Sequence, residues 1–257
     1  MILVLDISNS NIVLAGMEES HALFSIRLST DLTRTPDEYS ALISFSAAGR
    51  GIDLKTTEGA IISSVVPQLT AVLREAVETV TGKIPLVVGP GVKTGLNIRI
   101  DDPGELGADF VAAAVAALSS YPLPCVTIDM GTATAIGVLD ARGDYVGGAI
   151  CPGIAVSRNA LARGTAQLPS VSLRAPGNVI SKSTVECMRS GLIYGTAAML
   201  DGLLERIESE LGMPVSAVAT GDFAASIVPH CQRKITVDEE LLLRGLWRIY
   251  IKNRRER

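Results

Sequence analysis

Two stretches of the chain share one pattern of apolar and polar positions. They cover residues 1–16 and 125–139, and in each a short apolar run ends in an aspartate, Asp6 or Asp129. A turn of small polar residues follows, and then a second apolar run. Short apolar runs bounded by turn residues are typical of buried strands. Each stretch therefore predicts a β-hairpin whose first strand ends in an aspartate.

Alternating strand and helix patterns follow each copy, and the second copy continues through a turn into a third strand, which gives a β-meander. Asp102 as N-cap and Pro103 as first residue predict a helix that runs to about Ser119. The other predicted elements are strands at 60–65, 86–88, 145–150 and 216–219, helices at 67–81 and 183–210, and a helical C-terminus.

The two aspartates stand about half a chain apart, which indicates one duplication and not a short-period repeat array. We therefore expect two lobes, residues 1–120 and 121–257, with the crossing at Tyr121–Pro124. The pattern leaves open whether the last helix packs back on the first lobe.

Composition is that of a globular α/β protein. Of 257 residues, 47% are hydrophobic, 19% charged and 4% aromatic, which allows a sizeable core of strands and helices. No apolar stretch approaches the length of a membrane span, and the N-terminus lacks the features of a signal peptide. The four cysteines stand far apart without metal-ligand spacing. We expect a cytoplasmic protein with reduced thiols that does not bind membranes.

The charge balance predicts no nucleic-acid partner. The net charge is −4, and the one basic run, Lys252 to Arg257, is interrupted by Asn253 and Glu256. Such a run is more typical of a solvated tail than of a nucleic-acid footprint.

The paired aspartate turns suggest a phosphate site. A carboxylate repels phosphate, so an aspartate there acts through a bridging cation, while residues 8–11 and 131–134 offer backbone N–H groups and hydroxyls in tight turns. One such turn alone is explained by hairpin geometry. Two copies favour a nucleotide clamped by two lobes. Neither a Walker A sequence nor GxGxxG occurs.

The motifs together resemble those of the type III pantothenate kinases, members of the acetate kinase, sugar kinase, Hsp70 and actin superfamily. The resemblance covers roughly residues 1–225 and rests on the two aspartate turns, Gly89–Gly95, Asp101–Pro103, Gly107–Asp109, Gly147–Gly153 with Ser157, Leu168–Pro169, Thr184–Glu186 and Thr220–Gly221. It implies a duplicated actin-like (ribonuclease H-like) α/β fold with mixed five-stranded sheets. It also implies ATP-dependent phosphorylation of pantothenate to 4'-phosphopantothenate, the first step of coenzyme A biosynthesis, by a homodimer.

Asp109 is the residue that we expect to carry the chemistry. It flanks an apolar stripe at helical spacing, where a carboxylate is costly unless it is paired or used. An aspartate that turns to solvent or pairs locally is the structural alternative. By resemblance, Asp109 is the base that takes the proton from the primary hydroxyl of pantothenate.

The resemblance implies the remaining site residues. For Mg²⁺-bound ATP they are Asp6, Ile7, Ser8, Asn9, Ser10, Asn11, Ile12, Val13 and Thr132. For pantothenate they are Gly107, Ala108, Asp109, Phe110 and Thr184. Asp129 would hold a monovalent cation, K⁺ or ammonium. The Thr220–Gly221 turn could seat adenosine.

Thr184 has a second explanation, since Ser183 and Glu186 fit a helix capping box around it. The glycines Gly191 and Gly195 suggest close helix packing.

The chain departs from the family pattern at several positions. Ser8 replaces a glycine, Ser10 a threonine and Asp222 a glycine, and Phe110 stands where the family has an arginine at the pantothenate end of the site. Two rival hypotheses follow. One is a weakly active or inactive nucleotide-binding regulatory protein, and the other is a kinase of another small alcohol.

Overall fold

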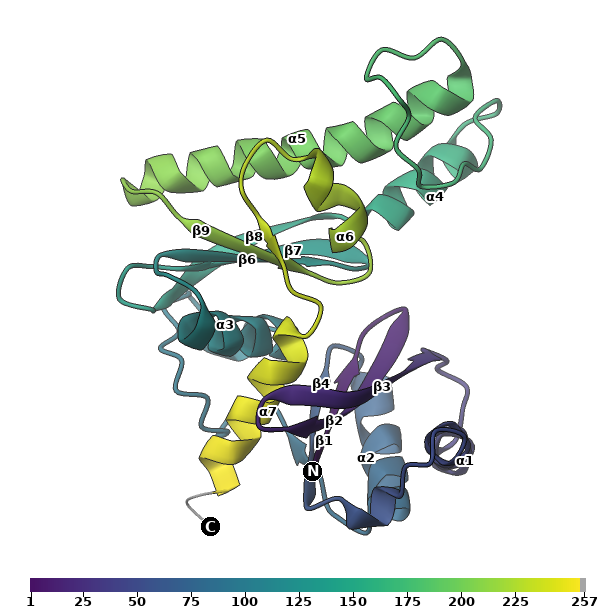
Figure 1. The fold of residues 1–257 in the computed structure, drawn as a ribbon, viewed down its shortest axis with the longest axis vertical. Coiled ribbons are helices and arrows are strands. Elements are labelled where there is room, and N and C mark those ends of the chain that lie inside the picture. Colours follow the sequence, from purple (N-terminus) through teal and green to yellow (C-terminus); the bar gives the residue numbers. More distant parts are fainter. Residues whose placement is uncertain (255–257) are drawn as a thin grey trace. The chain divides into compact units, whose positions relative to one another are not determined.

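The computed structural model describes residues 1–254, which form two compact units (Figure 1). Unit 1 contains Met1–Leu96, Asp101–Ser119 and the chain from Glu240, and unit 2 contains Asn97–Ile100 and Ser120–Glu239. The lobes predicted at 1–120 and 121–257 remain a prediction. The compact units differ from them at the C-terminus, because helix α7 (Leu241–Arg254) packs on strands of unit 1.

Unit 1 is built on a five-stranded mixed sheet in the order β3-β2-β1-β4-β5. Strand β1 pairs antiparallel with β2 and parallel with β4, so the hairpin lies on one side of β1 and the later strands on the other. The strands are β1 (Ile2–Ile7), β2 (Asn11–Glu18), β3 (His21–Ser29), β4 (Gly59–Ser64) and β5 (Leu86–Val87). The helices are α1 (Pro36–Ala48), α2 (Pro67–Thr81), α3 (Ala108–Ser120), α7 and the short 3₁₀ helices η1 (Leu54–Thr56) and η2 (Pro103–Glu105).

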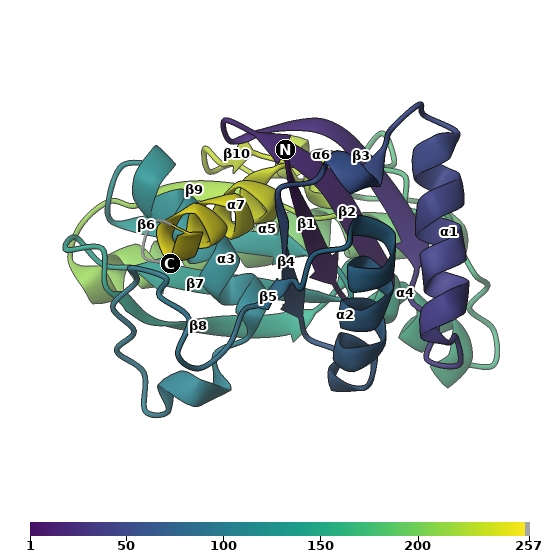
Figure 2. The same ribbon diagram turned by 90° about the horizontal axis from the view of Figure 1, so that it is seen from below.

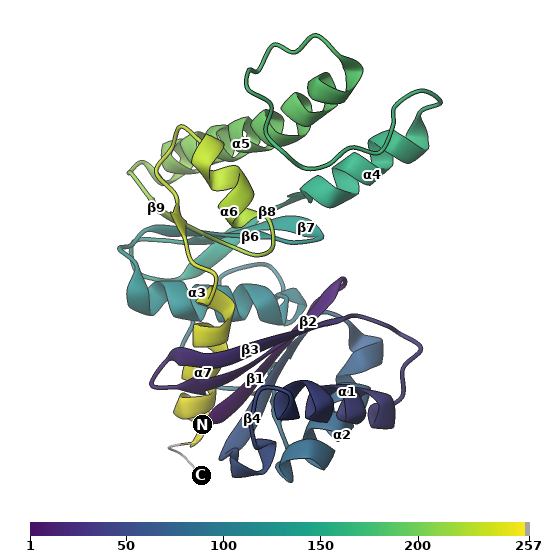
Figure 3. The same ribbon diagram turned by 45° about the vertical axis from the view of Figure 1, so that its right-hand side comes forward.

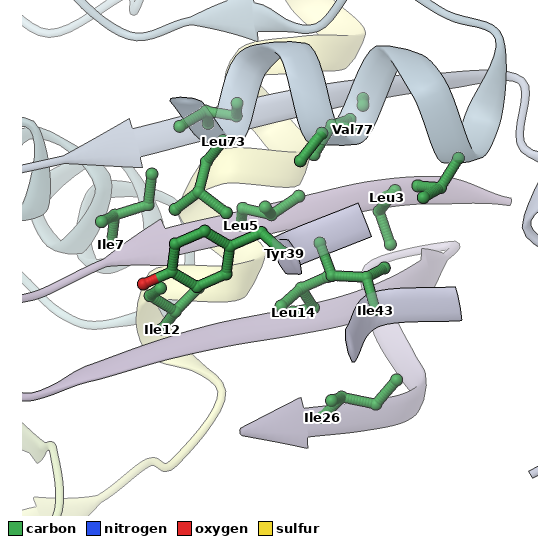
Figure 4. Packing of buried hydrophobic residues seen from close by; sticks show 14 of the residues in the cluster. Leu3, Leu5, Ile7, Ile12, Leu14, Ile26, Tyr39, Ile43, Leu73 and Val77 are labelled. Carbon is green, nitrogen blue, oxygen red and sulfur yellow. The ribbon is translucent and has the colours of Figure 1, made fainter. Parts of the chain in front are cut away.

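The core of unit 1 lies between this sheet and helices α1 and α2 (Figure 4). Leu3, Leu5 and Ile7 of β1 are fully buried in it. Tyr39 of α1 is also fully buried, and its hydroxyl donates to the carbonyl of Asp31 at 2.9 Å. Because strand side chains alternate between faces, this packing leaves Asp6 on the opposite face of β1.

Helices α3 and α7 meet in unit 1 at a glycine (Figure 2). A Cβ at Gly245 of α7 would lie 1.9 Å from the carbonyl oxygen of Ala112 in α3. Only glycine allows the two backbones to approach so closely. The alanine-rich sequence of α3 and the glycine in α7 thus form one tight crossing.

Unit 2 repeats the topology of unit 1. Its sheet has the order β10-β9-β6-β7-β8, with β6 antiparallel to β7 and parallel to β9. The elements are β6 (Cys125–Met130), β7 (Ala133–Leu139), β8 (Tyr145–Pro152), α4 (Ile154–Gly164), α5 (Thr184–Leu211), β9 (Ser216–Thr220), α6 (Ala224–Ile227), η3 (Val228–His230) and β10 (Thr236–Val237). The duplication and the two mixed five-stranded sheets predicted from the sequence are confirmed.

One long helix covers the core face of the unit 2 sheet (Figure 3). Leu192, Leu200 and Leu204 of α5 pack with Val126 and Ile128 of β6. The predicted helix at 183–210 is therefore confirmed, and Ser183 caps it by accepting from the amide of Glu186 at 3.3 Å. No helix within residues 1–254 has the length and hydropathy required to span a bilayer.

The single helix expected from Pro103 to Ser119 is wrong. Asp102 caps only the short helix η2 by accepting from the amide of Gly104, and Leu106 is extended at φ −67° and ψ 119°. This residue ends the helical run, and α3 begins afresh at Ala108. The consequence is that Asp109 lies in the first turn of a helix and not in its middle.

Candidate active site

Asp6 lies at the end of β1, where the first of the two predicted phosphate loops begins. Its carboxylate accepts from the hydroxyl of Ser8 at 2.9 Å. The amide of Ser8 donates to the carbonyl of Asn11 at 3.0 Å, which closes the turn, and the Thr30 hydroxyl donates to the carbonyl of Ser8 at 2.6 Å. The loop is therefore fixed at its base, while Asn9 and Ser10 at its tip are exposed.

The carboxylate of Asp6 is buried on the face of β1 opposite the core, with 7% of the residue exposed. Burial raises its pKa to about 6, the hydroxyls of Ser8 and Ser63 offset part of this rise, and the charge of Asp109 adds to it. Ser63 is the partner of Asp6 in the β1–β4 ladder. The Ser63 hydroxyl is buried without a well-formed hydrogen bond in the described chain. A carboxylate and a buried hydroxyl thus lie side by side where the loop begins.

Asp109 is the second residue of α3. Its carboxylate accepts from the amide of Phe110 at 2.8 Å. An amide donor lowers the pKa of a carboxyl, as does a helix N-terminus, yet loss of solvent outweighs this and raises the pKa of Asp109. Its charge also raises the pKa of Asp6, so the two carboxylates of unit 1 lie close enough to interact electrostatically.

Gly107 and Phe110 shape the surroundings of this carboxylate. A Cβ at Gly107 would lie 2.4 Å from Oδ1 of Asp109 and 3.6 Å from Cδ2 of Phe110. The side chains of Asp109 and Phe110 therefore both lie beside the backbone of Gly107. The half-buried ring of Phe110 offers no hydrogen-bond donor there.

In unit 2, Asp129 occupies the place that Asp6 occupies in unit 1. It stands at the end of β6, paired with Thr220 of the parallel strand β9. Gly221 adopts φ +90°, and a Cβ there would lie 2.4 Å from Oδ1 of Asp129 and 2.7 Å from the amide nitrogen of Met130. A residue with a side chain would be strained by its backbone and would also strike the carboxylate.

The second loop, which contains Thr132, is supported by Gly153. The amide of Gly131 donates to the carbonyl of Ala133 at 3.0 Å, and the amide of Gly153 donates to that of Thr132 at 3.2 Å. A Cβ at Gly153 would lie 2.2 Å from the carbonyl oxygen of Thr132. Thr132 itself is exposed at the tip of the turn, as Asn9 and Ser10 are in the first loop.

Thr184 begins helix α5 and is exposed. Because Ser183 caps the helix, the Thr184 hydroxyl is not used as the N-cap. The other site residues predicted from the sequence are either buried or half-buried. Ile7, Ile12 and Ala108 are buried, and the side chains of Ile7 and Ile12 belong to the core of unit 1, so only their backbone can serve the loop. Asn11 and Val13 are half-buried.

Sequence reasoning missed Ser63, named Gly153 only as part of a family motif without a role in the site, and gave little weight to Gly221. Each lies beside a predicted site residue only through the fold, on β4, after β8 and after β9. The Thr-Gly dipeptide after a strand was a signal for Gly221, and Ser63 carried none. In the described part of the chain no cluster of three or more acidic, histidine or cysteine side chains is arranged to hold a metal ion.

Comparison with known proteins identifies the family. The model of the family described as type III pantothenate kinase matches residues 2–206. The chain belongs to the type III pantothenate kinases. Type III pantothenate kinases of Moorella thermoacetica and Pelobacter propionicus are each 41% identical to it over 254 residues, covering 98% and 99% of this chain and 100% of both relatives. The chain is thus a kinase that transfers phosphate to pantothenate in coenzyme A biosynthesis.

Solved structures agree on the fold. A structure described as a conserved Baf family transcriptional activator from Campylobacter jejuni superimposes with a TM-score of 0.62 at 19% identity, covering 98% of this chain and 99% of that one. An activator of 2-hydroxyisocaproyl-CoA dehydratase from Clostridium difficile gives 0.58 at 13% identity, covering 100% and 97%. At this identity the likeness concerns the fold alone, which is the actin-like fold of ATPases and sugar kinases.

Proposed function

We propose that Asp109 is the catalytic base for transfer of the γ-phosphate of ATP to the primary hydroxyl of pantothenate. The observation that carries this assignment is the placement of its half-buried carboxylate in the first turn of α3, close enough to Asp6 for its charge to raise the pKa of that carboxyl. A base works best when its pKa lies near the operating pH. Desolvation moves the pKa of Asp109 in that direction.

The loop from Asp6 to Val13 and the turn at Thr132 are proposed to bind the phosphates of ATP. Mg²⁺ is commonly held by one or two carboxylates together with substrate phosphates. Asp6, with the buried hydroxyl of Ser63 beside it, fits that donor set. When bound, the ion neutralises charge on the phosphates. The protein's own part is to hold Asp6 in place through Ser8 and the closed turn.

Asp129 is proposed to hold a monovalent cation, K⁺ or ammonium. Its carboxylate stands at the end of β6 against Gly221, where a side chain would strike Oδ1. An oxygen donor suits such a hard cation. A cation at this point would offset the repulsion between Asp129 and phosphate.

The acceptor is proposed to contact Gly107, Ala108, Asp109, Phe110 and Thr184. Asp109 accepts the proton of the hydroxyl as oxygen attacks phosphorus, and the bond from phosphorus to the bridging oxygen of ADP breaks. A homodimer and a cytoplasmic setting complete the proposal. The homodimer rests on the family resemblance, and the cytoplasmic setting rests on the widely spaced cysteines of the chain.

A second candidate is a regulatory protein that binds nucleotide without efficient turnover, and a third is a kinase of another small alcohol. Phe110 favours both, because a ring beside the base cannot replace the hydrogen bonds of an arginine. Turnover with ATP, Mg²⁺, K⁺ and pantothenate, compared with a panel of small alcohols, separates these candidates.

The assignment of Asp109 is tested by Asp109→Asn. The variant keeps the shape of the side chain and removes the base, so kcat should fall by roughly 10²–10⁴ while ATP binding, measured by calorimetry, stays nearly intact. Its thermal stability should change little. A variant that keeps more than a tenth of wild-type turnover would remove Asp109 from the mechanism.

A further inference from the structure

The segment Asn97–Ile100, which we call the strap, comes from the first half of the chain and lies beside the sheet of unit 2. Residues Asn97–Ile100 belong to unit 2, whereas the chain on both sides of them belongs to unit 1. The amide of Tyr145 donates to the carbonyl of Asn97 at 2.8 Å, and the amide of Arg99 donates to that of Tyr145 at 2.8 Å. The strap thus continues the sheet beside the start of β8.

Asp144 binds the strap through its side chain, and only 9% of this residue is exposed. Its Oδ1 accepts from Nδ2 of Asn97 at 2.9 Å, and its Oδ2 forms an ion pair with Nε of Arg99 at 2.9 Å. Each carboxylate oxygen therefore holds one strap residue. Charge-assisted hydrogen bonds of this kind are stronger than neutral ones.

The turn that carries Asp144 is fixed by hydrogen bonds between its own residues. The carboxylate of Asp140 accepts from the amides of Arg142 at 2.8 Å and Asp144 at 2.9 Å, and Gly143 takes φ +81°. Arg142 also reaches Oδ2 of Asp144, at 3.5 Å, but belongs to the turn and not to the strap. These hydrogen bonds lie within the turn and do not involve the strap, so the turn offers a fixed anchor.

The anchored strap lies within the long connection between β5 and α3, which ends at Asp109. Connections of this length without regular strands or long helices are usually functional. The earlier part of the connection is fixed as well, since Asn253 of α7 accepts from the amide of Lys93 at 3.2 Å and donates to its carbonyl at 2.9 Å. After the strap, the chain passes through η2 and Gly107 to the carboxylate of Asp109.

We propose that Asp144 is a positioning residue for phosphoryl transfer, acting through Asn97 and Arg99 on the segment that delivers Gly107 and Asp109. This inference rests on the proposed role of Asp109 as base. The strap itself contributes little to overall stability, because the side chains of Asn97 and Arg99 are exposed. Releasing it should loosen a local segment without unfolding the protein.

Two arginines on the same carboxylate provide a matched test. Arg99→Ala removes the strap arginine, and Arg142→Ala removes the turn arginine, which is similarly exposed. We expect Arg99→Ala to lower kcat with pantothenate roughly ten- to a hundredfold, since a small misplacement of a catalytic group has effects of this order. KM for ATP and the melting temperature should stay near wild type. Arg142→Ala should change none of these, and Arg99→Lys should recover part of the loss.

Hydrogen exchange gives a readout without turnover. The amides of Arg99 and Tyr145 should exchange faster in Arg99→Ala than in Arg142→Ala. Equal kinetics and equal exchange in the two alanine variants would overturn the positioning role while leaving the base assignment intact. Full activity of Asp109→Asn would instead overturn the base assignment, and the positioning role with it.

Discussion

The carboxylate of Asp109 lies where a side chain at Gly107 would have to be. The distance from a Cβ at Gly107 to Oδ1 of Asp109 would be 2.4 Å, far inside van der Waals contact. Gly107 is thus explained by the position of a neighbouring side chain and not by an unusual backbone. The observed position of the Asp109 carboxylate therefore requires a glycine at residue 107.

Gly107→Ala should therefore reduce activity while leaving the fold intact. The added methyl group must push the carboxylate aside, and kcat should fall roughly ten- to a hundredfold. Steady-state kinetics with thermal melting would measure both effects. Gly49→Ala is a suitable control, because Gly49 has φ −61° and a Cβ there would stand 3.4 Å from the carbonyl oxygen of Phe45. A kcat within twofold of wild type in Gly107→Ala would contradict the expected displacement.

Asp6 should make the protein less stable as the pH rises. Its pKa is about 6 when folded, against 3.8 for an ordinary aspartate. The folded state therefore favours the protonated form, and the resulting stabilisation is complete below the unfolded pKa and is lost as pH rises through about 6. Asp6→Asn should remove this dependence and raise the unfolding free energy at pH 7 by up to about 3 kcal/mol, while abolishing turnover.

Chemical denaturation at pH 4, 5, 6 and 7 would show the effect of Asp6. Asp37→Asn, a change at an exposed aspartate of α1, should leave the pH dependence as in the wild type. If the wild type and Asp6→Asn lose stability in parallel over this range, Asp6 does not titrate there.

Activity should need K⁺ or ammonium if Asp129 holds a monovalent cation. Replacing K⁺ by Na⁺ at constant ionic strength should lower turnover at least tenfold, because Na⁺ is smaller and binds its water more tightly. Asp129→Ala should remove most activity and any remaining difference between the ions. Initial rates over a series of salt concentrations would measure this. Equal rates in K⁺ and Na⁺ with the wild type would refute the cation site.

Phe110→Arg should lower KM for pantothenate and leave ATP affinity unchanged. One charge-assisted hydrogen bond is typically worth about 1.5–3 kcal/mol, roughly ten- to a hundredfold in affinity. Phe110→Leu keeps an apolar side chain and should show no such gain. A KM for pantothenate that is the same in Phe110→Arg and Phe110→Leu would show that residue 110 does not contact the acceptor.

The repeated hairpins could be predicted because their signal is local. A buried strand, an aspartate and a small polar turn recur in order, and the observed registers of Asp6 and Asp129 follow from them. Helix α2 was predicted with its bounds for the same reason, since Pro67 starts it and Gly82 ends it at φ +71°. Helix α1 had equally clear signals in Thr35 and Glu38 but was not predicted.

Two kinds of feature could not be read from the sequence. The signals at Asp102 and Pro103 are real, but they cap a 3₁₀ turn, because the extended conformation of Leu106 depends on the surrounding chain. Ser63 and Gly221 adjoin the aspartates only after β4 and β9 have paired in parallel with β1 and β6. Parallel pairing joins distant segments, and a sequence carries no local mark of it.

The crossing of α3 and α7 has a consequence for how the protein is made. By its order along the chain, α7 follows β10 as α3 follows β5, so it belongs to the second repeat, yet it packs on the first unit at Gly245 and Ala112. Domains usually fold in the order in which they leave the ribosome. Here unit 1 is synthesised almost completely before unit 2, but the face of its sheet that α7 covers stays exposed until α7 leaves the ribosome. A nascent chain that has not yet produced α7 therefore contains both predicted phosphate loops, but it lacks the helix against which α3, the helix that carries Asp109, packs.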